Sequence, residues 1–156
     1  MKTERIISPD SAVESIQAET VRHLAELFPG QTVEAIGSMA VPMEGRPEID
    51  IMIVSESAES VEADAQRLAV EGFARGPIEK GIAYLKEMRS GIEIAVQIIP
   101  AGHKMIDIHH TILGKLSSDP ALRTAYEQFK RTLEGLDKAE YKKRKSRWVE
   151  DNLLNQ

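Results

Sequence analysis

The sequence predicts one α/β domain of the α+β kind, in which helices cover one face of a small mixed sheet and a helical part follows. Three observations indicate this class. Residues 33–54 read as two strands around a turn and a short polar loop, and residues 82–99 read as a β-hairpin. Apolar residues at helical spacing precede, separate and follow these strands. With 156 residues, 42% of them hydrophobic, we expect a single domain over residues 1–156, with a core at about 8–100 and a helical part at about 101–156.

The first helix is predicted to begin at Ser8-Pro9-Asp10 and to end at Pro29-Gly30. Serine can cap a helix, proline fits the first helical position, and aspartate favours the positive end of the helix dipole. His23 lies just beside the apolar stripe of this helix, and no second ligand stands near it at metal spacing. We therefore interpret His23 as a surface or helix-packing residue.

The strand at residues 48–54 carries the main chemical signal. Side chains alternate between the two faces of a strand, so Glu48 and Asp50 share one face while the isoleucines between and after them share the other. Two neighbouring carboxylates suit Mg²⁺ (or Mn²⁺) that also binds phosphate oxygens. The Gly37-Ser38 turn offers backbone N–H groups and a hydroxyl to the same phosphates. The alternative is a strand whose polar face carries acids with no metal.

These residues resemble two known patterns. Gly37-Ser38 followed by Glu48-Ile49-Asp50-Ile51 resembles the signature of the nucleotidyltransferase fold. More narrowly, the chain is similar to the GrpB family over nearly its full length. The similar segments are AIGSMAVP at 35–42, the Arg46-Pro47 pair before IDI, AYEQFKRTLEG at 125–135 and YKKRKSRWVEDNL at 141–153.

Three departures separate this chain from the usual family pattern. The family has His before Ile-Gly-Ser and Thr after it, where this chain has Ala35 and Met39. A later strand of the family reads His-Leu-His, where this chain has Ala95-Val96-Gln97. Family members have an apolar residue in place of Glu48, so this chain meets the acidic pattern of the wider superfamily better than its relatives do.

The resemblance implies metal-dependent binding of a nucleotide or phosphorylated ligand, and transfer of a nucleoside monophosphate from a nucleoside triphosphate to an unknown acceptor. In that reaction Glu48 and Asp50 would hold Mg²⁺, and a third carboxylate could act as base. The resemblance also assigns phosphate-binding positions, which in this sequence are Gly37, Ser38, Arg46, Lys130, Arg144 and Lys145. For each basic residue on the C-terminal helices, the alternative is a solvated side chain.

A second class of function stays open beside the enzyme. The chain could be a non-catalytic module that keeps the fold and a phosphate-binding cleft, and the resemblance allows a supporting role because some GrpB relatives are fused to dephospho-coenzyme A kinase. A carboxylate at the third position favours the enzyme, whereas a neutral or apolar residue there favours the module.

The middle of the chain supplies the candidate for that third position. Residues 57–73 are predicted to be a helix and residues 72–81 a loop, since Gly72, Gly76-Pro77 and Gly81 cluster there. Residues 82–88 and 92–99 then read as strands around an Arg89-Ser90-Gly91 turn. Glu93, Ala95 and Gln97 share one face of the second strand. Glu93 is the candidate third acid, and Gln97 is the neutral alternative.

The last third is predicted to be helical. Ser118 or Asp119 with Pro120 opens one helix, which ends at Gly135, and Asp137 with Glu140 predicts a capping box for the final helix. Between the strands and these helices, His109 and His110 are adjacent and point about 100° apart on a helix, so they do not chelate one ion. The sequence also lacks the motifs of zinc proteases, serine hydrolases and P-loop proteins.

Charge and composition limit the classes of partner that we expect. Residues 1–100 hold 9 Lys and Arg against 17 Asp and Glu, whereas residues 101–156 hold 11 against 8. This asymmetry fits a metal on one wall of a cleft and phosphates held from the other, although a solvated basic helix gives the same pattern. Aromatic content is only 4% and no stacking platform is visible, so nucleic acid is not the expected partner. The absence of cysteine, signal peptide and long apolar run favours a cytoplasmic protein with no membrane partner.

Overall fold

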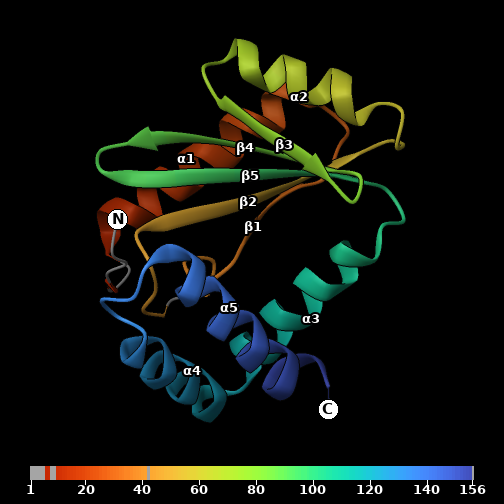
Figure 1. Cartoon of the computed structure of the whole chain (residues 1–156). Helices are drawn as coiled ribbons and strands as arrows, with labels where there is room; N and C mark the ends of the chain where they lie inside the picture. Colours follow the sequence, from red (N-terminus) through yellow and green to blue (C-terminus); the bar gives the residue numbers. More distant parts are fainter. Residues whose placement is uncertain (1–5, 8–9, 42, 156) are drawn as a thin grey trace.

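The computed structural model describes residues 6–7, 10–41 and 43–155. Within them a five-stranded sheet has the order β1-β2-β5-β4-β3 (Figure 1). The central strand, β5, runs parallel to its neighbour β2, and the other neighbouring strands are antiparallel, so the sheet is mixed as predicted. The strands are β1 (Val33–Ile36), β2 (Glu48–Ser55), β3 (Ala74–Glu79), β4 (Ile82–Arg89) and β5 (Ile92–Pro100).

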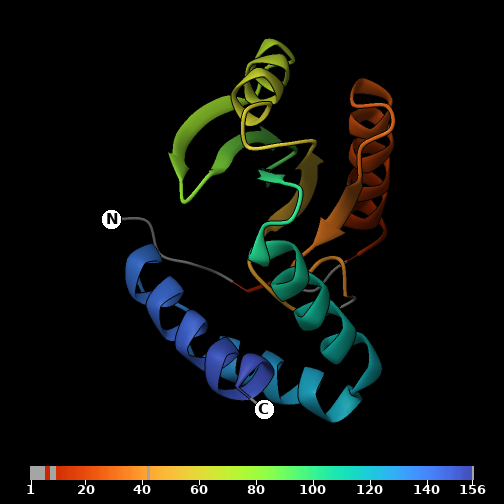
Figure 2. The ribbon, with the colours of Figure 1, turned by 90° about the vertical axis from the view of Figure 1, so that its right-hand side faces the viewer.

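The helices lie in two groups. The first group, α1 and α2, packs on one face of the sheet. The second group, α3 to α5, forms the helical C-terminal part, in which α3 also packs on the other face of the sheet and α4 and α5 are antiparallel (Figure 2). Their bounds are α1 (Ser11–Leu27), α2 (Val61–Val70), α3 (Lys104–Ser118), α4 (Pro120–Thr132) and α5 (Lys138–Val149), with a π-helical turn at Glu150–Leu154. None of the described helices is long and apolar enough to cross a membrane.

The alternation of β2 decides which side of the sheet becomes core. Ile49, Ile51 and Ile53 are completely buried against α1 and α2, and burying each contributes about 1.5–3 kcal/mol relative to exposure. Met52 lies on the opposite face and is also buried, in a second cluster that α3 covers. The acidic side chains of β2 therefore lie at the beginning of the strand, at Glu48 and Asp50, whereas Ser55 at its end is buried and donates a hydrogen bond to Asp64.

The first helix agrees with its sequence signals. The side chain of Asp10 caps α1 by accepting a hydrogen bond from the backbone N–H of Val13, at 2.9 Å. The other two residues of the predicted start, Ser8 and Pro9, lie outside the described residues. His23 is exposed and lies 3.4 Å from Glu71, as expected of a surface or helix-packing residue. The second helix, α2, is shorter than the predicted 57–73.

The prediction of a loop at residues 72–81 was wrong. Most of this segment is β3, an edge strand whose six residues are all exposed. An edge strand needs no buried face and accommodates proline, so it leaves no alternating pattern in the sequence. The register with β4 shifts between Arg75 and Ile78, where Gly76-Pro77 lies. Lys80 and Gly81, both with positive φ, form the tight turn into β4, as Ser90 and Gly91 do between β4 and β5.

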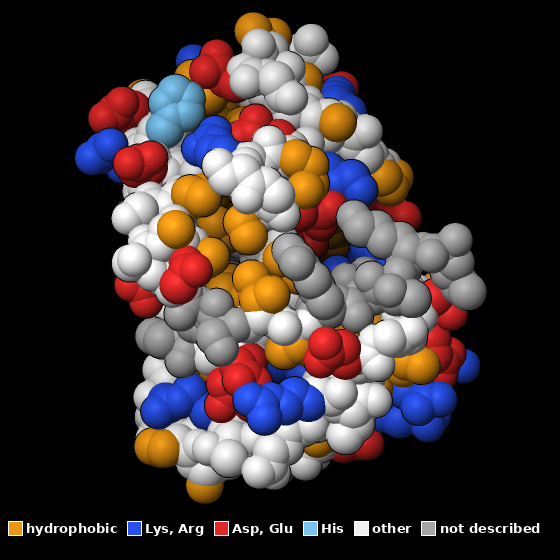
Figure 3. Space-filling model, turned by 90° about the vertical axis from the view of Figure 1, so that its left-hand side faces the viewer, with side chains coloured by type: hydrophobic (Ala, Val, Ile, Leu, Met, Phe, Trp, Pro, Cys, Tyr) orange, Lys and Arg blue, Asp and Glu red, His pale blue; other side chains and the backbone are white. Residues whose placement is uncertain are grey.

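The C-terminal helices begin where predicted. Asp119 caps α4 and Asp137 caps α5, each accepting a backbone hydrogen bond from the residue three positions later. The side chain of Glu140, expected to complete a capping box by accepting from the backbone N–H of Asp137, instead accepts a hydrogen bond from Arg144 at 2.7 Å. Figure 3 shows basic and acidic side chains lying side by side over the lower, helical part of the molecule.

Candidate functional site

The Gly37-Ser38 turn lies directly over the carboxylate of Asp50. Ile36 is the antiparallel partner of Asp50, so the turn that follows β1 begins beside this acid. Gly37 has φ +77°, and a Cβ atom at this position would lie only 2.5 Å from Asp50 Oδ2. Glycine is required here both for the left-handed backbone and for the close approach.

Three carboxyl groups meet at the beginning of β2 and β5. Glu48 and Asp50 share a face of β2, as predicted, and the parallel register places Glu93 of β5 opposite Glu48. Burial and the nearby Asp50 raise the pKa of Glu48, and burial raises the pKa of Asp50. A hydrogen bond with Glu48, together with burial, raises the pKa of Glu93. Three such acids cannot easily all be ionised, and an added cation would stabilise their ionised forms.

Basic side chains face these acids across a small pocket. Arg46 Nη2 lies 2.8 Å from Glu48 Oε2, and its guanidinium lies over the ring of Tyr141. Lys145, from α5, favours the ionised form of Asp50 and lines the same pocket. The residues around the pocket are Ser38, Arg46, Glu48, Asp50, Tyr141 and Lys145.

Lys130 of α4 is completely buried beside the turn. Its ammonium group donates a hydrogen bond to Ser38 Oγ at 2.7 Å, bonds to the backbone oxygen of Glu44, and lies 4.4 Å from the ring centre of Tyr126. Burial and the positive charge of Lys145 lower the pKa of Lys130 to about 7. The alternative of a solvated lysine is therefore excluded at this position.

Of the six predicted phosphate-binding residues, five converge and one lies elsewhere. Gly37, Ser38, Arg46, Lys130 and Lys145 surround the acidic end of β2. Arg144, although adjacent to Lys145, lies in a groove between α4 and α5 and pairs with Glu140.

Sequence reasoning did not assign a role to three residues that face the acids from α5. Tyr141 lines the pocket and lies under the guanidinium of Arg46. Lys138 favours the ionised form of Glu93, and the negative charges of Glu48 and Glu93 favour the charged form of Lys142. The positions 138, 141, 142 and 145 recur at helical spacing, so a helical-wheel reading could have found this face.

The histidines of this region have other partners. His109 Nε2 lies 3.0 Å from the side-chain oxygen of Gln97, and His110 lies 2.7 Å from Glu34. Gln97, the neutral alternative to Glu93, is thus paired with α3, whereas Glu93 lies beside Glu48. His103 caps α3 by accepting a hydrogen bond from the backbone of Met105.

The donor set suits a metal that arrives with its phosphate ligand. Among the described residues, no group of three or more His, Asp or Glu side chains is arranged to hold a metal ion by itself. Mg²⁺, however, is commonly bound through one or two carboxylates plus substrate phosphates and water. Burial raises the pKa of both Glu48 and Asp50, so a bound cation would favour their ionised forms, and the pair is compatible with that mode.

The five-stranded mixed sheet and its helices form a nucleotidyltransferase-like fold. The chain belongs to the GrpB family, whose model matches residues 5–154. It is similar to the crystal structure of the conserved protein GrpB from Enterococcus faecalis, with a TM-score of 0.74 and 22% identity over 94% of this chain and 98% of that one. A search of curated proteins gives no match.

The fold extends to polymerases that add nucleotides. The Cid1 poly(U) polymerase is similar with a TM-score of 0.60 and 14% identity, over 80% of this chain and 42% of that one. The non-canonical poly(A) polymerase in the GLD-2–GLD-3 complex has a TM-score of 0.55 and 15% identity, over 80% of this chain and 45% of that one. The chain thus spans less than half the length of these polymerase chains, and the likeness concerns the fold.

Proposed function

We propose that this protein binds a nucleoside triphosphate, or a similar phosphorylated ligand, together with Mg²⁺ at the Gly37-Ser38 turn. One observation carries the proposal: a single small pocket joins two carboxylates, Glu48 and Asp50, to the cations Arg46 and Lys145 and to the Ser38 hydroxyl. Carboxylates suit Mg²⁺, and cationic side chains suit phosphates. A pocket lined by both therefore suits a ligand made of a metal ion and phosphates.

Each residue has a specific part in this binding. Lys130 donates to Ser38 Oγ, so the hydroxyl hydrogen of Ser38 is left to donate to another acceptor such as a phosphate oxygen. The backbone N–H groups of the turn and the charge of Lys145 add to the attraction for phosphate. Glu48 and Asp50 would hold Mg²⁺, which when bound neutralises charge on the phosphates.

We further propose that the bound nucleotide is a donor of nucleoside monophosphate. An acceptor hydroxyl oxygen would form a bond to the α-phosphorus, the bond to the β-phosphate oxygen would break, and pyrophosphate would leave. Glu93, whose raised pKa makes it a better base, stands opposite Glu48 and would take the hydroxyl proton. The fold likeness to poly(U) and poly(A) polymerases supports this reaction class.

A second candidate is a non-catalytic module that binds the same ligand. It is favoured by two contacts that use the acids internally: Arg46 pairs with Glu48 at 2.8 Å, and Lys86 lies 3.8 Å from Glu93. In such a module the phosphate would bind to Ser38 and Lys145, and no bond to the α-phosphorus would form.

Thermal melting with a panel of nucleoside triphosphates tests the binding. A ligand at 100 times its Kd adds about 2.7 kcal/mol, which raises the Tm of a domain of this size by several degrees. The expected rise requires Mg²⁺ or Mn²⁺ and is absent with EDTA. A panel without any shift would contradict the proposed binding. Release of pyrophosphate in the presence of candidate acceptors separates the enzyme from the module, which would bind without release.

A further inference from the structure

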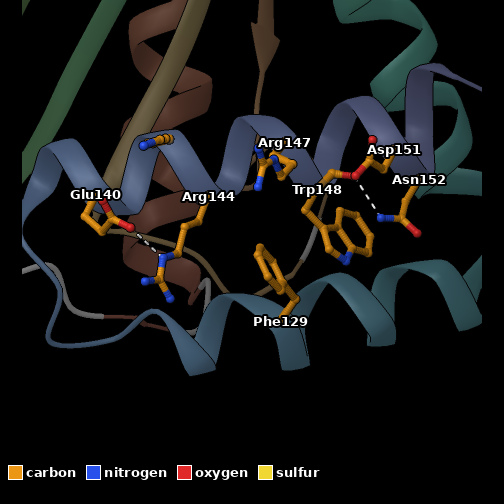
Figure 4. A pocket seen from close by; sticks show the side chains of 8 residues that line it. Phe129, Glu140, Arg144, Arg147, Trp148, Asp151 and Asn152 are labelled. Carbon is orange, nitrogen blue, oxygen red and sulfur yellow. Dashed lines mark hydrogen bonds and ion pairs between the residues drawn. The ribbon is translucent and has the colours of Figure 1, made fainter.

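A groove between α4 and α5 lies apart from the pocket described above. Its volume is about 430 Å³, which is within the range of ligand-binding clefts. Figure 4 shows Phe129 rising from α4 and Trp148 descending from α5 between the two helices, with Arg144 on one side and Asn152 on the other. The proposed nucleotide binding makes no use of this groove.

The groove is built on an aromatic stack. The ring of Trp148 lies nearly parallel to that of Tyr126, with centroids 4.7 Å apart and an interplanar angle of 5°. Phe129 stacks on Trp148 at 5.6 Å and 17°. Tyr126 is buried, whereas Phe129 and Trp148 are half-buried and line the groove, so part of each ring surface faces it.

The same groove carries positive charge from α5. Lys143, Arg144 and Arg147 line it together with the acids Glu140 and Asp151. Glu140 neutralises Arg144 through a 2.7 Å contact. With the residues that the structure describes, Lys143 and Arg147 form no ion pair, so their charges are available to an anion.

We propose that this groove binds single-stranded nucleic acid, with a base packed against Phe129 and Trp148 and phosphates held by Lys143 and Arg147. Aromatic surface beside cations is the combination that single strands require, because bases pack on rings while the backbone follows positive charge. A strand is favoured over a free nucleotide because Lys143 and Arg147 lie one helical turn apart on α5, so their charges can hold successive phosphates of a backbone. The stack joins residues of two helices, so the sequence showed no such platform.

The intrinsic fluorescence of Trp148 reports this binding directly, since it is the only tryptophan in the 156 residues. We would titrate the full chain, in EDTA and without nucleotide, with an oligouridylate of about ten nucleotides, a length within the usual site sizes. The expected result is saturable quenching, with much weaker binding of UMP and of a duplex of equal length. Absence of quenching would overturn the proposal, as would UMP or duplex binding as tightly as the single strand.

Two groove variants and one control sharpen the test. Phe129→Leu and Arg147→Gln should each weaken binding at least about fivefold, and Arg147→Gln should reduce the slope of log K against log salt by about 0.7. Arg22→Gln removes a charge from an exposed position on α1 and should change nothing. Arg147 is exposed, so we expect Arg147→Gln to fold. If this variant binds the oligonucleotide as tightly as the parent, the proposal is overturned, even if Phe129→Leu misfolds.

Asp50→Asn separates this inference from the proposed function. It alters the central pocket, not the groove, so it should bind the oligonucleotide as the parent does. Oligonucleotide binding without any nucleotide-dependent rise in Tm would refute the proposed function alone. The reverse result would refute only the groove.

Discussion

Lys130 Nζ donates a hydrogen bond to Ser38 Oγ across 2.7 Å, although the two residues are 92 positions apart in the chain. The contact ties α4 to the turn that follows β1, and it places a completely buried amine beside the proposed phosphate site. A buried charge of this kind costs stability unless it is neutralised or paired. The contact therefore couples the turn to the helical part, and we expect each to contribute to the stability of the other.

The titration of Lys130 predicts a pH dependence of stability. Its pKa falls from 10.5 to about 7 in the folded protein, so between these values the unfolded chain binds more protons than the folded one. Unfolding free energy should then rise with pH over this window, with a contribution approaching about 1.4 kcal/mol per pH unit. Lys130→Met should lack this contribution. Denaturant unfolding of both proteins from pH 6 to pH 10 measures the difference, and parallel pH profiles would contradict the lowered pKa.

Asp50→Asn should leave the metal-free protein as stable as the parent or slightly more stable at pH 7. The pKa of Asp50 is raised by burial, so its ionisation opposes folding as pH rises through that pKa, and asparagine removes this cost. Any gain should vanish in acid, where Asp50 of the parent is protonated. Melts with and without Mg²⁺ and nucleotide should show the ligand-dependent rise in the parent and little of it in the variant. A destabilised variant with the full rise would identify Asp50 as a structural acid.

Neighbouring positions on α5 provide a matched pair. Lys145 lines the pocket with Asp50, whereas Arg144 lies in the other groove. Lys145→Gln should weaken binding of the Mg²⁺–nucleotide complex and reduce its dependence on salt, because a phosphate contact is lost. Arg144→Gln should leave this binding unchanged and alter stability by less than about 0.5 kcal/mol. Calorimetric titration at two salt concentrations measures both effects. Equal affinities in the parent, Lys145→Gln and Arg144→Gln would show that Lys145 does not contact the phosphates.

Alanine substitutions at two glycines with similar backbone angles separate the cost of backbone strain from the cost of a steric clash. Gly37 and Gly30 have φ of +77° and +81°, but only at Gly37 would a Cβ meet other atoms, at 2.5 Å from Asp50 Oδ2. Gly30→Ala should cost about 1–3 kcal/mol through the backbone alone. Gly37→Ala should cost more, because the carboxylate must also move, and it should reduce Mg²⁺-dependent nucleotide binding. Chemical denaturation gives the two costs, and an equal cost in both variants would contradict the close approach.

Some features of the site follow from local sequence. The alternation of β2 places Glu48 beside Asp50 on one face, and the Ser90-Gly91 turn fixes the hairpin of β4 and β5. Asp119 and Asp137 cap their helices through residues three positions away. Each of these depends on backbone geometry over a few neighbouring residues, which the sequence specifies directly.

The burial of Lys130 has only a weak signal in the sequence, which also fits a solvated lysine. Lys130 falls in the apolar stripe of α4, four residues after Tyr126 and three before Leu133, where a solvated lysine is not expected. That position predicts burial once the stripe is drawn, but not a partner. The partner, Ser38, belongs to a turn whose path depends on Gly45 approaching both residues, since a Cβ at Gly45 would lie 2.8 Å from Ser38 Cβ.

By itself the sequence determined the fold class, the shared face of Glu48 and Asp50, and the positive charge of the last helix. Only the tertiary structure decided that β3 is a strand, that Glu93 stands opposite Glu48, and that Lys145 faces the acids while Arg144 faces away. The reason is the range of the forces involved. Alternation and capping act between near neighbours, whereas strand register and the facing of helices depend on how distant segments pack together.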